Sequence, residues 1–229
     1  ILAVIFNQYF ATVVAGGERG VEFFGVRLHG ASFFTFSVAL SMAISAVLSP
    51  FLGAVADASA SKKRFLMIFC YIAILFTGLL YFVHAGNYWR GAIFFIIANI
   101  GFACGNVYYN AFLPEISTDQ NIGRISGFGW ASGYIGGGVL LGINLVMLKY
   151  PDWLGFPAGY FTVQDCFLSV AFWWLIFSLP TFLFLRERAQ KALPPSGKSY
   201  FSEGFRRLLH TFRRINTFRV LTKFLVAYL

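Results

Sequence analysis

Amide side chains at helical spacing are the groups in this sequence most able to bind a small solute. Asn99, Asn106 and Asn110 are separated by seven and four residues, which places them on one face of a helix. Asn7 and Gln8 lie in another apolar run. Amides donate and accept hydrogen bonds without carrying charge, so they could hold the amino and carboxylate groups of an amino acid. The alternative is hydrogen bonding between helices, which contributes about 0.6 kcal/mol on average.

Charged residues gather in short turns between apolar runs. Two of these turns hold Asp57, Lys62, Lys63, Arg64, Glu115 and Arg124. We expect Asp57, Glu115 and Arg124 to form a charge network at one membrane face, and the alternative is that they anchor helix ends at the headgroups. The interiors of the long apolar runs contain no Asp, Glu, Lys or Arg, which gives little support to proton coupling within this chain.

The residues that usually perform catalysis or bind metals do not form a pattern. The histidines lie in separate regions and the cysteines lie in or beside apolar runs, where small apolar packing is their usual role: His29, His84, His210, Cys70, Cys104 and Cys166. We therefore predict no catalytic residue, no metal site and no cofactor, and a membrane-embedded enzyme is an unfavoured alternative.

The elements that carry these residues must be membrane helices. The 229-residue chain is 58% hydrophobic and 12% charged, about half the charged fraction of a soluble domain. A bilayer span needs about 20 apolar residues. Such runs predict helices over 30–56, 65–84, 91–113, 126–148 and 166–185, with 1–15 as the end of a first helix and Pro114 ending the fourth. The segments 16–28, 57–64, 85–90 and 149–165 are expected to be loops or turns.

The basic residues predict the orientation. The side with the 57–64 and 114–125 turns and the segment after residue 185 carries fourteen Lys and Arg residues, and the other side carries four. By the positive-inside rule the basic side is cytoplasmic. This asymmetry accounts for the net charge of +9, so no nucleic-acid partner is expected.

The segment 186–216 reads as a linker followed by a basic amphipathic helix. Apolar residues recur at helical spacing within 201–216, with four arginines between them. Such a helix is expected to lie on the anionic inner leaflet, and a calmodulin-like partner is the unfavoured alternative.

Small residues form stripes in two of the predicted helices. The second helix has Ser41, Ser45 and Ser49, and the fifth has Gly129, Gly133 and Gly137. Small residues at every fourth position let membrane helices pack closely. The equivalent places of these helices suggest two inverted three-helix repeats, whose faces slide during transport, although ordinary packing explains the stripes equally well.

Two motifs resemble those of a known transporter superfamily. Gly53 and Asp57, followed by Lys62, Lys63 and Arg64, resemble the cytoplasmic loop signature of the major facilitator superfamily (MFS), although Ala58 stands where that family usually has a basic residue. The runs 108–116, 123–130 and 133–138 look like its vacuole-effluxer branch, which includes autophagy-related vacuolar amino-acid exporters and bacterial permeases.

The resemblance implies a fold and a set of roles. The chain is expected to be the N-terminal six-helix half of a twelve-helix all-α membrane protein, with 1–185 as the transmembrane half, 186–216 as the linker and 217–229 starting a seventh helix; its partner would be a C-terminal half. Helices one and four line the central cavity in this superfamily. The expected solute contacts are therefore Asn7, Gln8, Asn99, Asn106, Asn110 and Tyr109, with Trp130 and Tyr134 from the fifth helix. The expected cytoplasmic gate is Gly53, Asp57, Lys62, Lys63, Arg64, Glu115 and Arg124.

The function implied is secondary active transport of a small solute, with amino-acid efflux as the more specific form. A non-transporting sensor or scaffold on the same fold is the main alternative, and a channel lacks a filter-like loop. A multi-pass protein of a bacterial inner membrane is expected, or of a vacuolar membrane in a eukaryote.

Overall fold

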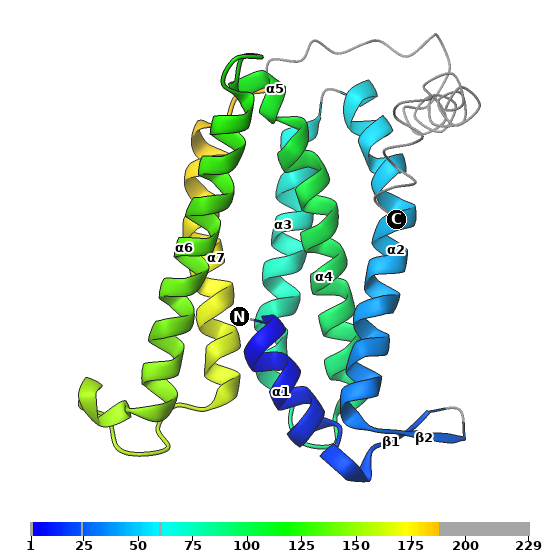
Figure 1. The fold of residues 1–229 in the computed structure, drawn as a ribbon, viewed down its shortest axis with the longest axis vertical. Helices are drawn as coiled ribbons and strands as arrows, with labels where there is room; N and C mark the ends of the chain where they lie inside the picture. The colour runs from blue at the N-terminus through cyan, green and yellow to red at the C-terminus, as the bar shows by residue number, and fades with distance from the viewer. Residues whose placement is uncertain (1, 24, 60, 188–229) are drawn as a thin grey trace.

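The computed structural model describes residues 2–23, 25–59 and 61–187. Five helices in this part are long and apolar enough to cross a membrane, and a shorter apolar helix covers Val4–Val14. The helices lie roughly side by side along the long axis of the molecule (Figure 1). The structure thus confirms the prediction of an all-α membrane bundle. The predicted amphipathic helix at 201–216 and the seventh helix at 217–229 lie outside the described residues.

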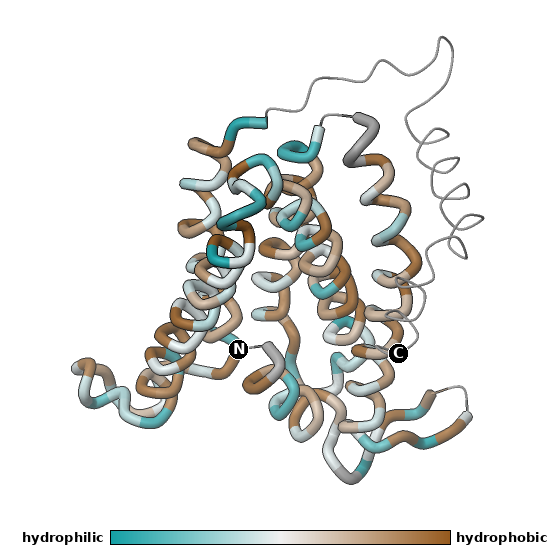
Figure 2. The backbone as a smooth tube through the Cα atoms, turned by 45° about the horizontal axis from the view of Figure 1, so that its top comes forward, coloured by the Kyte–Doolittle hydropathy of each residue, from teal (hydrophilic) through white to brown (hydrophobic). Residues whose placement is uncertain are grey.

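The helices follow the apolar runs of the sequence. The short α1 (Asn7–Tyr9) lies between two π-helical turns (Leu2–Phe6 and Phe10–Val14). The long helices are α2 (Gly30–Ser59), α3 (Lys62–Leu79), α4 (Tyr88–Ala111), α6 (Ile122–Lys149) and α7 (Val163–Phe184), and a one-turn helix α5 (Leu113–Ile116) follows α4. Figure 2 shows hydrophilic segments concentrated toward the two ends of the bundle and in the loops, as expected for a protein that spans a bilayer.

The prediction of a plain loop over 16–28 was wrong. Strands β1 (Val21–Phe23) and β2 (Val26–Leu28) pair antiparallel there, with Phe23 opposite Val26. Gly25 adopts a φ of 78°, a conformation that a tight hairpin turn requires and that glycine takes without a steric cost. The alternation of apolar and polar residues on both sides of Gly25 was the signal for strands.

Several helix boundaries also differ from the prediction by a few residues. The fourth helix stops at Ala111 rather than at Leu113, and Pro114 lies in the first turn of α5 rather than after a helix end. Proline is tolerated there because that position has no helical hydrogen-bond partner for an N–H group. The predicted 57–64 turn is also shorter, since α2 continues to Ser59 and α3 begins at Lys62.

The core joins the first helix to α2, α4 and α7. The buried ring of Phe6 lies 5.5 Å from those of Phe10 and Phe95 and 5.3 Å from that of Phe167, measured between ring centroids. Nearby, the Tyr9 hydroxyl donates a hydrogen bond to the Val83 carbonyl at 2.9 Å and accepts one from the Gln164 amide. These contacts connect the first helix to the segment after α3 and to the start of α7.

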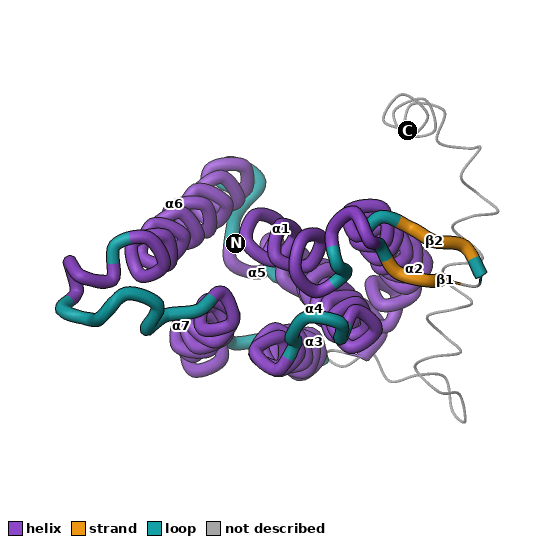
Figure 3. The backbone as a smooth tube through the Cα atoms, turned by 90° about the horizontal axis from the view of Figure 1, so that it is seen from below, coloured by secondary structure: helices purple, strands orange, loops and turns teal. Residues whose placement is uncertain are grey.

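A close backbone approach fixes α4 on α3. A Cβ added to Gly101 would lie 3.0 Å from the Phe69 carbonyl oxygen and 3.0 Å from the Ala73 nitrogen. Only glycine lets the helices approach this closely without a shift. By contrast, α6 lies at the margin of the bundle beside α7 (Figure 3). Only 11% of its most apolar stretch is buried inside the structure.

A cleft between three helices and a clamp at their ends

A cleft lies between α3, α4 and α7 and has a volume of about 260 Å³. Its walls include aromatic rings from two helices and polar groups from α4 and α7: Phe102, Asn106, Tyr109, Trp174, Phe177 and Thr181. None of the residues that line it is Asp, Glu, Lys, Arg or His. The cleft can therefore accept a small solute that offers apolar surface and a few hydrogen-bonding groups.

Small residues of α4 make room for this cleft. Gly101 and Gly105 both line it, and Gly101 also packs against the backbone of α3. The Phe102 and Trp174 rings meet edge to face across it, with centroids 5.8 Å apart. One helix face thus provides both the close packing and the open space.

The three asparagines of α4 have different surroundings. Asn106 lines the cleft, and Asn110 is exposed near the end of the helix. The amide nitrogen of Asn99 donates a hydrogen bond to the Ser41 hydroxyl of α2 at 2.7 Å. For Asn99 the structure therefore contains the interhelical contact that was the alternative to solute binding.

The other predicted solute contacts do not all meet at the cleft. Tyr109 lines it, whereas Asn7 and Gln8 are exposed on α1 and are not among its lining residues. On α6, Trp130 and Tyr134 are also exposed, and their rings lie 6.2 Å apart. Solute contact by these four side chains remains a prediction.

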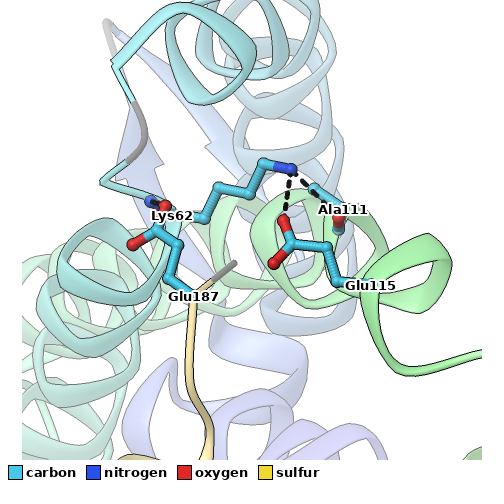
Figure 4. Close-up of polar contacts among 4 residues, drawn as sticks. All are labelled: Lys62, Ala111, Glu115 and Glu187. Carbon is cyan, nitrogen blue, oxygen red and sulfur yellow. Dashed lines mark hydrogen bonds and ion pairs between the residues drawn. The ribbon is translucent and has the colours of Figure 1, made fainter. Parts of the chain in front are cut away.

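A charged clamp lies at the end of the bundle where α3 begins (Figure 4). The Lys62 ammonium is 2.8 Å from the Glu115 carboxylate of α5, and these side chains are only 12% and 13% exposed. The same ammonium lies 3.4 Å from the carbonyl of Ala111. Because unpaired carbonyls at a helix C-terminus attract cations, Lys62 joins α3 to the end of α4 through two favourable contacts.

A second pair of contacts joins α3 to the end of α7. Glu187 accepts a hydrogen bond from the backbone N–H of Lys62 at 2.7 Å, which places a carboxylate at the N-terminus of α3. Lys63 donates to the Leu185 carbonyl at 2.7 Å, just after α7. Both charges match the helix end that they contact. No role for Glu187 was predicted from the sequence, because it is one charged residue within a mostly basic segment.

The predicted charge network is thus built from a partly different set of residues. Lys62 and Glu115 are paired, but Arg64 and Arg124 are exposed and form no ion pair within the described residues. The side chain of Asp57 lies outside the described part of the chain. A Cβ on Gly53 would lie 3.9 Å from Val107, so this glycine faces α4. Gate roles for Asp57 and Arg124 remain predictions.

The two small-residue stripes differ in their contacts. Ser41 and Ser45 are buried and Ser49 is half-buried, and the Ser45 and Ser49 hydroxyls donate to carbonyls one turn earlier in α2. On α6, Gly129 lies against the Tyr109 hydroxyl, but Gly133 and Gly137 have no neighbour within 4 Å of an added Cβ among the described residues. A packing role for these two glycines remains a prediction. The α6–α7 pair instead contains a hydrogen bond from the Ser169 hydroxyl to the buried Asn144 at 2.7 Å.

A metal site would need a group of side chains that could bind the ion together. The described residues contain no group of three or more His, Cys, Asp or Glu side chains that could hold a metal ion. The three cysteines are free and buried.

Comparisons with known proteins show which family the chain resembles. The sequence profile described as "Vacuole effluxer Atg22 like" matches residues 15–123 and 116–229. The chain is 26% identical to the uncharacterized MFS-type transporter YxiO of Bacillus subtilis over its whole length, which covers 51% of that protein. It is 22% identical to autophagy-related protein 22 of Yarrowia lipolytica, covering 91% of this chain and 47% of the relative. The chain thus spans about half the length of these relatives. No solved structure matches it significantly.

Proposed function

This chain belongs to the vacuole effluxer Atg22-like family, and on that premise we propose that it serves in secondary active transport of small solutes across a membrane. Membership confirms the predicted MFS branch and agrees with the prediction that the chain is not an enzyme. The chain is a multi-pass integral membrane protein. We further propose amino acids as the solute class and efflux as the direction.

The observation that carries this proposal is the cleft between α3, α4 and α7. Its lining includes Asn106 and Tyr109 together with the aromatic residues Phe102, Trp174 and Phe177. A polar group is costly in a membrane unless it faces a cavity or a partner. Its hydrogen-bonding groups are neutral, which suits a zwitterionic solute better than one with net charge.

The clamp at the end of the bundle supports a second part of the proposal. Transporters of this kind alternate between two access states around a fixed site. The Lys62–Glu115 pair links two helix ends on the side that the basic residues predict to be cytoplasmic. We infer that the pair stabilises one access state and opens in the other.

Reconstitution of the full-length protein that contains this chain tests the proposal directly. Vesicles loaded with an unlabelled amino-acid mixture should accumulate a labelled amino acid by counterflow, and Asn106→Ala should reduce that accumulation. The matched control is Asn87→Ala, because Asn87 precedes α4 outside the cleft. A non-transporting sensor would bind the amino acid and raise the melting temperature without counterflow, which would overturn the transport proposal.

A further inference from the structure

The hairpin between the first helix and α2 has one apolar face and one polar face. Residues directly opposite each other in an antiparallel pair point to the same side of the ribbon. The register therefore places Glu22 and Arg27 on one face. The opposite face holds Val21, Phe23, Val26 and Leu28.

The apolar face is directed along α2, toward the membrane. The Phe23 ring lies 5.6 Å from the Phe33 ring and 5.3 Å from the Phe36 ring, between centroids. Phe36 is six residues into α2, which is about 9 Å from the start of the helix at 1.5 Å per residue. A side chain that reaches Phe36 points into the span, so Glu22 and Arg27 point toward water.

The base of the hairpin is covered by the bundle, but its tip is not. Val21 is 3% exposed, whereas Val26 is 60% exposed. Val26 stands opposite Phe23, and Phe23 also contacts the Trp89 ring at 5.6 Å. Because Phe36 and Trp89 are 45% and 47% exposed, an open apolar patch surrounds Phe23.

This patch continues along an exposed face of α2. Leu40 and Val47 lie on the same face of α2 as Phe36 by the helical period and are 39% and 76% exposed. Figures 1 and 3 show the hairpin projecting sideways from the bundle beyond α2, instead of folding over the helix ends. A hairpin in this position lies beside the end of α2, at the level where that helix leaves the membrane.

We propose that the β1–β2 hairpin is an interfacial anchor whose apolar face rests on lipid, at the boundary between headgroups and acyl chains. Aromatic residues such as Trp89 are enriched at this depth, and amphipathic elements bury their apolar face there while the polar face stays in water. The anchor fixes the height of α2 in the leaflet opposite the Lys62–Glu115 clamp. The proposal does not depend on which solute is transported.

Quenching of a fluorophore at the hairpin tip tests the anchor. The full-length protein, with all its native cysteines, Cys70, Cys104 and Cys166 among them, replaced by alanine, carries Val26→Cys labelled with an environment-sensitive dye and is reconstituted in phospholipid vesicles. The control is Glu22→Cys, on the opposite face of the same hairpin. Both positions are exposed, so neither change removes core packing, and size-exclusion chromatography checks that each variant folds.

The anchor predicts opposite results at the two positions. The dye at Val26 should emit at shorter wavelength than the dye at Glu22, lose intensity when nitroxide-labelled lipid is added and resist iodide in the buffer. The dye at Glu22 should be quenched by iodide. Quenching of the Val26 dye by iodide would show that the tip lies in water. Protection of that dye from both quenchers would show that protein covers the tip. Either result overturns the proposal.

Discussion

Neutralising the clamp between Lys62 and Glu115 should shift the balance between access states. The atoms of the pair are 2.8 Å apart and the side chains are 12% and 13% exposed. Fully exposed pairs contribute 0.2–1 kcal/mol, and hydrogen bonds to charged groups about 1.5–3 kcal/mol. For a largely buried pair we expect a coupling energy of about 1.5 kcal/mol. If the contact exists in one state only, losing it changes the ratio of states by about tenfold.

The coupling energy is measured with a double-mutant cycle of Lys62→Met and Glu115→Gln, which removes the other contacts of each side chain from the comparison. The readout is the rate at which an impermeant maleimide alkylates Phe102→Cys, a cleft position that is 48% exposed, in a background without other cysteines. Arg64→Met is the matched control, because Arg64 is exposed and forms no ion pair within the described residues. A coupling energy near zero, with alkylation rates equal to those of the parent protein, would refute the clamp.

Three further changes test other contacts between the helices. Gly101→Ala should destabilise the protein by about 1–3 kcal/mol, because the new methyl group would meet the backbone of α3 at 3.0 Å; Gly133→Ala, which meets no described neighbour, should leave the melting temperature in detergent nearly unchanged. Glu187→Gln should cost about 1 kcal/mol in thermal unfolding, since it removes the carboxylate charge at the α3 N-terminus, and an unchanged unfolding curve would contradict that role. Asn99→Ala should cost about 0.6 kcal/mol and preserve solute affinity, and a large loss of affinity would instead assign Asn99 to the solute site.

Much of the fold follows from hydropathy, because membrane spans are long and apolar. The predicted helix over 126–148, for example, is observed as Ile122–Lys149. The hairpin was missed because its strands are three residues each and lie between two strong helix signals. Pro114 was expected to end a helix, but proline also suits the first turn of a new one, and the sequence alone does not separate these cases.

The site was only partly predictable, because periodicity identifies a face but not the neighbour that covers it. The spacing of Asn99 and Asn106 placed them on one stripe, yet Asn99 contacts Ser41 on α2 while Asn106 lines the cleft. Partners for charges depend on the lateral distances between helix ends. In the structure, Lys62 is the residue close enough to pair with Glu115, and Glu187 lies at the N-terminus of α3.

The contact between Tyr9 and Gln164 constrains the order of membrane assembly. The two residues are 155 positions apart in the chain, whereas Tyr9 and its other partner, Val83, are 74 apart. During synthesis the Tyr9 hydroxyl can reach the Val83 carbonyl once α3 has entered the bilayer, but the Gln164 amide arrives only with α7. Four long helices, α2, α3, α4 and α6, therefore enter the membrane after the first helix and before α7 supplies the Gln164 amide. Helix α7 thus closes the described bundle on the first helix, so an error in inserting α7 leaves the first helix without its contact to Gln164.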